Sequence, residues 1–213
     1  MMLETWLGSI GLEEFRATYL QRAPLAQPAT ARDARELLDW SVLSTVLGVA
    51  PAPDVLVVAG GALLPWPAPS GLGTLGVYLG RGAGLCIRRA QRSHPGLARV
   101  AAAMEATLPG ARAEVQLFVT PGSTHGFGWH YDDEDVFIVQ TVGAKDYFFR
   151  ANTIASDRPA HGDVFMRFAE EQSPICTARL HAGDFLYLPA RWWHMARCLE
   201  DALSISIGVS GAR

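Results

Sequence analysis

The chain has 213 residues, of which 49% are hydrophobic and 18% are charged, a composition typical of a globular protein with a buried core. Its net charge of -3 and pI near 6.1 give no basic surface for nucleic acids or anionic membranes, so we expect neither as a partner. The sequence has no apolar stretch long enough to predict a membrane span.

The cysteines and the first residues of the chain indicate the cellular compartment. The three cysteines, Cys86, Cys176 and Cys198, form an odd and sparse set without CxxC spacing, which is unlike a disulfide framework. The opening MMLETWLGSIGLEEF carries acidic residues and no basic segment, so it is not expected to be a secretion signal. We therefore expect a cytoplasmic protein.

The first half of the chain predicts helices. Apolar residues at helical spacing predict one helix around residues 7–19 and a second in the segment 34–48. Residues 51–84 are rich in Gly and Pro and are interpreted as loops joining short strands, with a β-type run at 55–58. A third helix is predicted over 93–108, because Pro95 suits its first turn and a Pro-Gly pair follows its end.

From residue 113 onward the sequence changes to short β-branched or aromatic runs separated by turn residues. These runs predict strands at 113–120, 136–141, 147–150, 176–180, 185–188 and 203–209. Such short strands without helices between them indicate a sandwich or barrel. We therefore predict a single domain over 1–213, with a helical layer at 1–50, a core barrel at 113–213 and a loop or lid at 151–174.

Candidate metal ligands occur in the segment GWHYDD. His130 and Asp132 are two positions apart, so on a strand they would point to the same face. His194 follows much later, in LYLPARWWHMA, just past a predicted strand. Two histidines and one carboxylate that leave coordination positions open are diagnostic of non-haem Fe(II) oxygenases. An HxD pair alone is weak, and Asp133 or Asp135 could replace Asp132 if the register differs.

Longer segments resemble a known family. VQLFVTPGSTHGFGWHYDDEDVFIVQTVGAKDYFFR and AGDFLYLPARWWHMA resemble the metal and distal-histidine segments of the cupin-like, JmjC-type 2-oxoglutarate oxygenases, in particular the branch with bacterial and human ribosomal oxygenases. CIRRAQRSHPGLARVAAAM and EEFRATYLQRAPL are similar to other parts of these proteins. The resemblance implies a mainly β fold, the double-stranded β-helix (jelly-roll or cupin barrel), with N-terminal and flanking α-helices.

The resemblance also implies roles for individual residues. His130, Asp132 and His194 match the Fe(II) ligands, and Lys145 matches the lysine that pairs with the far carboxylate of 2-oxoglutarate. A dicarboxylate held by iron at one end needs a cation at the other, and Lys145 is the single lysine in a chain with 17 arginines.

Further contacts to the co-substrate are less well marked. Thr120 and Ser206 are candidate hydroxyl donors to the same carboxylate, although Thr120 would equally suit a strand-to-Pro turn. Ribosomal members of the family commonly have a tyrosine and an asparagine where this chain has Phe118 and Gln116. Phe118 removes a hydroxyl contact, so the carboxylate pocket must be completed otherwise, and Gln116 is a candidate co-substrate contact.

The predicted activity is hydroxylation of a C–H bond with Fe(II), 2-oxoglutarate and O₂. The substrate would be a small molecule, a peptide or a protein side chain, and the sequence does not predict the oligomeric state. Two alternatives stay open, namely a metal-binding cupin with another activity and a JmjC-like binding module without catalysis.

Overall fold

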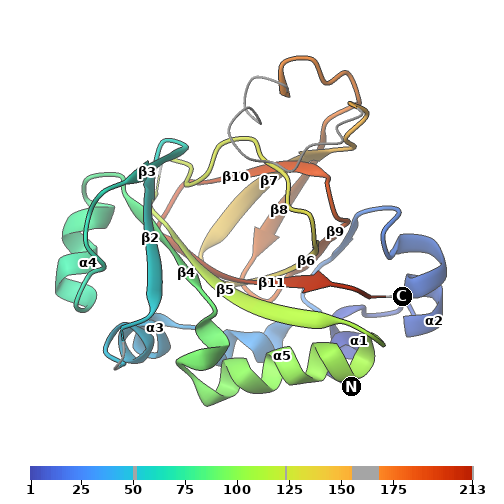
Figure 1. The fold of residues 1–213 in the computed structure, drawn as a ribbon, viewed down its shortest axis with the longest axis horizontal. Coiled ribbons are helices and arrows are strands. Elements are labelled where there is room, and N and C mark those ends of the chain that lie inside the picture. Colours follow the sequence, from blue (N-terminus) through green and yellow to red (C-terminus); the bar gives the residue numbers. More distant parts are fainter. Residues whose placement is uncertain (50–51, 123, 155–167, 213) are drawn as a thin grey trace.

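Two antiparallel β-sheets of unequal size face one another, and a layer of helices covers the outer side of the larger sheet (Figure 1). The computed structural model describes residues 1–49, 52–122, 124–154 and 168–212. In spatial order, the larger sheet contains β1 (Leu25–Gln27), β9 (Phe185–Leu188), β6 (Asp135–Val142), β11 (Ala202–Ser210), β5 (Arg112–Thr120), β4 (Gly84–Arg88), β2 (Asp54–Ala59) and β3 (Ala62–Leu64). The smaller sheet contains β10 (Trp193–Cys198), β7 (Ala144–Arg150) and β8 (Cys176–His181).

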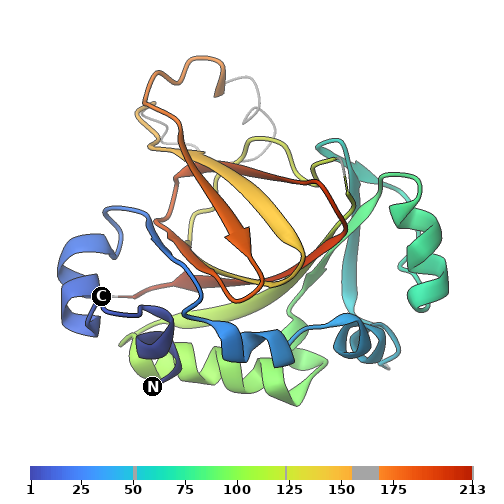
Figure 2. The same ribbon diagram turned by 180° about the vertical axis from the view of Figure 1, so that it is seen from behind.

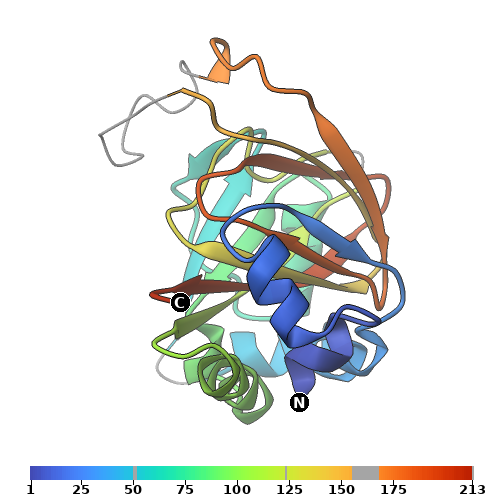
Figure 3. The ribbon, with the colours of Figure 1, turned by 90° about the vertical axis from the view of Figure 1, so that its right-hand side faces the viewer.

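The helices lie mostly on one side of the larger sheet. They are α1 (Met2–Trp6), α2 (Leu12–Glu14) with a π-helical turn at Phe15–Tyr19, a 3₁₀ turn at Arg32–Glu36, α3 (Trp40–Leu47), α4 (Leu72–Leu79), a 3₁₀ turn at Ala90–Arg92 and α5 (Pro95–Thr107). In Figures 1 and 2, α5 runs along the larger sheet beneath β5, whereas α4 lies to one side beside β2. In Figure 3 the blue N-terminal segment lies in front of the sheets. None of the helices within the described residues is long and apolar enough to cross a membrane.

Core-facing and cavity-facing residues alternate along the central strands β11 and β5, so one face of each strand lies on the core and the other faces the space between the sheets. In β11, the apolar residues Leu203, Ile205, Ile207 and Val209 belong to the main hydrophobic core, which they share with helix α5. The intervening Ser204, Ser206 and Gly208 face the other sheet, because successive side chains of a strand point to opposite faces. Strand β5 follows the same rule: Val115, Leu117 and Val119 belong to the core, whereas Gln116, Phe118 and Thr120 line the space between the sheets.

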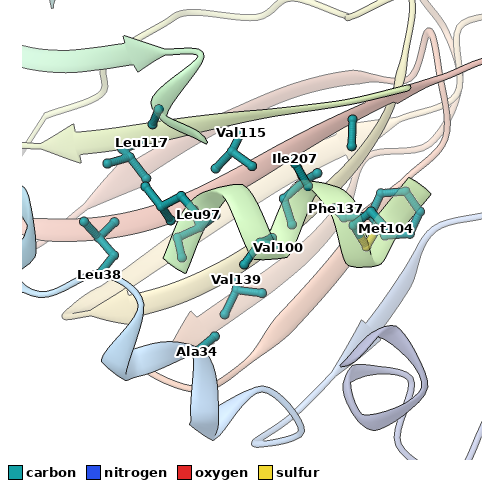
Figure 4. Packing of buried hydrophobic residues seen from close by; sticks show 14 of the residues in the cluster. Ala34, Leu38, Leu97, Val100, Met104, Val115, Leu117, Phe137, Val139 and Ile207 are labelled. Atoms are coloured by element: carbon teal, nitrogen blue, oxygen red, sulfur yellow. The ribbon is translucent and has the colours of Figure 1, made fainter. Parts of the chain in front are cut away.

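Figure 4 shows how the helical side of this core is filled. Leu97, Val100 and Met104 of α5 lie against side chains of β5, β6 and β11. These three residues recur at spacings of three and four, which places them on one face of the helix. The apolar stripe predicted for residues 93–108 is therefore the face that packs on the sheet, and Pro95 occupies the first turn as expected.

Most predicted elements are present with boundaries shifted by one to three residues. The predicted mainly β class and the six strands after residue 113 are confirmed, as is the strand predicted at 55–58, which is β2. The second predicted helix is divided into a 3₁₀ turn and α3, because Asp39 caps α3 by accepting a hydrogen bond from the Val42 N–H.

Strands β1 and β10 and helices α1 and α4 were not among the predicted elements, whereas β3 and the start of β4 fall in the segment 51–84, where short strands were expected without bounds. Helix α4 lies where loops were expected; its glycines hide the helical pattern, but Leu75 and Tyr78 are buried and anchor it. Strand β10 was missed because its sequence, WHMARC, has no β-branched residue and is held as a strand by pairing with β7. His194 consequently lies inside a strand rather than just past one. The short strands β1, β3 and β4 likewise depend on their neighbours.

Gly84 provides a test of the close contact between β4 and β5. A Cβ at this position would overlap the carbonyl oxygen of Val119, a backbone atom that cannot move without disturbing the strand pair. Gly84→Ala should therefore lower the free energy of unfolding by about 1–3 kcal/mol and the melting temperature by about 2–10 °C. Thermal unfolding followed by circular dichroism would measure this change. Gly73→Ala is the control, since a Cβ there meets open space in α4 and should not destabilise the protein. Equal melting temperatures for both variants would contradict the argument.

Candidate metal centre and adjoining cavity

The three predicted metal ligands lie together in the structure. One potential ligand atom from each of His130, Asp132 and His194 lies within 4.8 Å of the others. His194 Nε2 is 3.5 Å from Asp132 Oδ2, and the centroids of the two imidazole rings are 4.2 Å apart. Among the described residues, no other group of three His, Cys, Asp or Glu side chains has this spacing.

Backbone hydrogen bonds bring these distant parts of the chain together. His130 N–H donates to the His194 carbonyl at 3.1 Å, and His194 N–H donates to the His130 carbonyl at 2.7 Å. A third backbone hydrogen bond joins the same two segments: Arg191 N–H donates to the Asp132 carbonyl at 2.7 Å. The segment around residues 130–132 is thus joined to the start of β10 by a short antiparallel bridge, which brings the three side chains together.

The orientation of both imidazole rings suits metal binding. His130 Nδ1 lies 2.8 Å from the Gly128 carbonyl oxygen, and His194 Nδ1 lies 3.0 Å from the Trp192 carbonyl oxygen. Since a carbonyl only accepts hydrogen bonds, each Nδ1 carries the proton and each Nε2 keeps a free lone pair. Burial, and after it the neighbouring His130, lower the pKa of His194, so its ring is neutral. Two imidazoles that can each present Nε2, together with one carboxylate, fit a divalent iron ion with open coordination positions.

A cavity of about 180 Å³ adjoins these residues between the two sheets. Lys145, Tyr147 and Ala196 line it from the smaller sheet. Gln116, Phe118, Thr120, Ser204, Ser206 and Gly208 line it from β5 and β11, and Leu56, Cys86 and Arg88 line it from β2 and β4. The predicted co-substrate contacts therefore share one cavity with the candidate ligands.

Lys145 is the most unusual of the cavity residues. Its side chain is only 2% exposed, and burial lowers its pKa to about 8. Its Nζ donates a hydrogen bond to Ser204 Oγ at 2.8 Å, and no carboxylate within the described residues forms an ion pair with it. A buried cation without a counter-ion is costly unless a bound anion completes the site.

The remaining predicted contacts occupy different parts of the cavity wall. Thr120 and Ser206 are almost completely buried. Gln116 accepts a weak hydrogen bond from Cys86 Sγ at 3.5 Å, so its amide faces β4 as well as the cavity. Phe118 lies beneath Lys145, with Nζ 5.9 Å from the ring centroid, where the ring offers a cation–π contact in place of a hydroxyl.

Sequence reasoning did not identify Ser204, although its Oγ accepts the hydrogen bond from Lys145 Nζ. The signal was present in the alternation of ALSISIGVS, in which Ser204, Ser206 and Gly208 interrupt apolar residues at every second position. Tyr147 was also missed. It is buried next to Ser204, and burial raises its pKa above the ordinary value.

The neighbouring acidic residues have distinct surroundings. Asp135 is 2% exposed and accepts hydrogen bonds from Tyr187 Oη at 2.5 Å and from the Ala190 N–H at 3.3 Å, so it supports the fold and does not replace Asp132. Asp133 is exposed and forms an ion pair with Arg191 at 3.2 Å.

Glu134 differs from both, because it lines the cavity. Burial, together with repulsion from Asp132 and Glu114, raises the pKa of Glu134 to about 7.

The predicted loop or lid at 151–174 falls partly on residues 155–167, which lie outside the described residues. At its described ends, the Glu171 carboxylate accepts hydrogen bonds from the N–H groups of Thr153 at 2.8 Å and Ser173 at 2.9 Å. Phe168 stacks on Trp129, the neighbour of His130, with ring centroids 4.3 Å apart. The two ends are thus tied to each other and to the edge of the metal centre.

Comparison with known proteins agrees with this architecture. Solved structures of Escherichia coli YcfD match 96% of this chain at 18% identity. One X-ray structure has a TM-score of 0.67 and another, a ribosomal oxygenase in complex with cobalt and 2-oxoglutarate, has 0.65. This likeness establishes the shared fold, and the chain spans 54% and 53% of those two chains.

Curated relatives are similar over a shorter region. Ribosomal oxygenase 1 of Gallus gallus is 36% identical over 102 residues, which are 47% of this chain and 17% of that protein. The bifunctional lysine-specific demethylase and histidyl-hydroxylase NO66 of Dictyostelium discoideum is 35% identical over 95 residues, which are 44% of this chain and 18% of that protein. This chain therefore spans less than a fifth of either relative. The model of the JmjC domain matches residues 87–212, more than half of the chain, and the chain belongs to the JmjC domain family.

Proposed function

We propose that this protein is an Fe(II)- and 2-oxoglutarate-dependent oxygenase that hydroxylates a C–H bond. The observation that carries the proposal is the pairing, in one cavity, of a His-Asp-His group with a buried lysine that has no carboxylate partner among the described residues. The first suits iron with open positions, and the second suits the far carboxylate of a dicarboxylate anchored on that iron. The YcfD complex with cobalt and 2-oxoglutarate, which shares this fold, supports the same pair of ligands.

In the proposed reaction, O₂, 2-oxoglutarate and a substrate C–H bond give succinate, CO₂ and a C–OH group. Bound iron would supply the activation of O₂. His130, Asp132 and His194 would hold the iron, with both imidazoles fixed by their Nδ1 hydrogen bonds. Lys145, with Ser204, would orient the co-substrate, and Thr120, Ser206 and Gln116 line the same wall.

We further propose that the substrate is a side chain of a protein or peptide. Support comes from the names of the similar proteins, which include a ribosomal oxygenase and a histidyl-hydroxylase. The cytoplasm remains the proposed location. All three cysteines are free, as expected in a reducing compartment.

The first experiment measures succinate release from 2-oxoglutarate by anaerobically Fe(II)-loaded protein after O₂ is added. His130→Ala should abolish release and weaken metal binding more than about 100-fold, because the site loses one of three ligands. His181→Ala is the matched control, since His181 is an exposed residue of β8 away from the cavity. Metal binding measured by calorimetry separates loss of the ligand from loss of turnover.

Two results would favour one of the two alternative functions over the oxygenase. Metal binding without 2-oxoglutarate binding would indicate a cupin of another activity. Failure to bind either one would indicate a JmjC-like binding module.

Lys145→Met should weaken 2-oxoglutarate binding about thirtyfold or more, because a neutral side chain of similar length leaves a buried carboxylate unpaired. Calorimetric titration of 2-oxoglutarate into Zn(II)-loaded protein would measure the dissociation constant without turnover. Phe148→Leu is a suitable control, since Phe148 is in the same strand but outside the cavity lining. An unchanged dissociation constant in Lys145→Met would remove the role assigned to Lys145.

The affinity for 2-oxoglutarate should also fall as the pH rises above 8. Burial lowers the pKa of Lys145 to about 8, so the free protein has a charged Lys145 below this pH and a neutral one above it. A required proton then costs up to about tenfold in affinity per pH unit above the pKa. Lys145→Arg, whose guanidinium stays charged, should lose this dependence. The same slope in both proteins would assign the effect to another group.

A further inference from the structure

Two aromatic side chains lie behind the candidate metal ligands. Tyr131 stands between His130 and Asp132 in the sequence, and Trp193 directly precedes His194. The antiparallel bridge pairs the two histidines, so Tyr131 lies opposite Trp193, one position away on each segment. The three ligands line the cavity and these two residues do not, because successive side chains of an extended chain point to opposite faces.

The rings of Tyr131 and Trp193 are in direct contact. Their centroids are 4.9 Å apart and their planes meet at 85°, the edge-to-face arrangement that aromatic pairs prefer. Tyr131 is 7% exposed and Trp193 is 1% exposed. Within the described residues, neither ring belongs to the main hydrophobic core or to the second cluster, around Leu186 and Leu188. Their contact therefore holds the two ligand-bearing segments against each other and does not extend either core.

Two further rings continue this arrangement beyond Trp193. Phe168 packs edge-on against Trp193, with ring centroids 5.4 Å apart, and it stacks on Trp129 at 4.3 Å. Trp129 directly precedes His130, so the series of contacts returns to the segment from which it started. These four rings, of Trp129, Tyr131, Phe168 and Trp193, are called the aromatic clamp below. Three of the four are sequence neighbours of a candidate ligand.

We propose that the aromatic clamp positions the metal ligands, with Trp193 as the positioning residue that fixes His194 relative to His130 and Asp132. This inference rests on the proposed function and adds to it residues that hold the metal centre without contacting the metal. Backbone hydrogen bonds set which residues of the two segments are paired. Opposed rings in contact also resist twisting of one segment against the other, and such outer partners orient the ligands of a metal.

The test uses Co(II) in place of iron, because its visible absorption reports both affinity and ligand geometry. Trp193→Leu should weaken Co(II) binding about tenfold or more and change the absorption spectrum of the bound ion. The indole Nε1–H has no acceptor among the described residues, so Trp193→Phe removes no hydrogen bond. Because Phe keeps a ring against Tyr131, it should change the affinity less than about threefold.

Trp6→Leu is the matched control for loss of a buried tryptophan. Trp6 is 0% exposed and belongs to the main hydrophobic core, where it packs against Phe185 at 6.1 Å. Its replacement should lower the melting temperature but leave the Co(II) affinity and spectrum unchanged. A general loss of stability is thereby separated from a change at the metal centre.

A double-mutant cycle tests whether the ring contact carries the effect. Tyr131→Leu alone should weaken Co(II) binding as Trp193→Leu does, and it serves as the test if Trp193→Leu does not fold. The variant with both changes should bind Co(II) no more than about threefold more weakly than the weaker single variant, because either change already breaks the contact. Independent effects would instead multiply.

Each outcome supports or overturns the inference. Unchanged Co(II) binding in the two leucine variants, an equal loss in Trp6→Leu or Trp193→Phe, or multiplying effects in the cycle would reject the clamp. Co(II) binding to the unaltered protein and to His130→Ala is measured first. If the unaltered protein binds Co(II) through His130 and the clamp variants behave like Trp6→Leu, only this inference fails; if it does not bind Co(II), the proposed function fails.

Discussion

The alternation of large apolar and small residues along β11, at the centre of the larger sheet, is the constraint on which the rest of the structure depends. Every second residue is a large aliphatic side chain packed against the helical layer, and the alternate residues are small and polar. A shift of register by one residue would bury the serines among the helices and expose the aliphatic side chains. Because β11 pairs with both β5 and β6, it fixes their register, and with it the wall of the cavity.

The cavity is built at a cost to stability. Lowering the pKa of Lys145 from 10.5 to about 8 corresponds to about 3 kcal/mol against the folded protein at neutral pH. That is a sizeable part of the stability of an ordinary domain. A well-packed apolar residue at this position would be more stable, so the stability of the fold does not explain the lysine.

The metal centre depends on the backbone more than on side-chain contacts. Reciprocal hydrogen bonds between His130 and His194, and the bond from Arg191 to Asp132, hold the ligand-bearing segments together. Asp135 reinforces them from the buried side, because it joins the start of β6 to Ala190 and to Tyr187. A site assembled in this way keeps its ligand geometry before any metal binds, which reduces the ordering that binding requires.

The sequence alone determined the β-rich second half and the α5 helix, because these depend on local periodicity and on turn residues. It also marked His130, Asp132, His194 and Lys145 as candidate site residues, through motif spacing and resemblance to a family. Tertiary structure decided the elements that have no such local signal. Strand β10 exists through its pairing with β7, α4 is held by two buried side chains, and Asp135 is buried by its contact with Tyr187. The polar wall with Ser204 and the contact of Tyr131 with Trp193 also required the fold, since they join residues from separate parts of the chain that only the folded structure brings together.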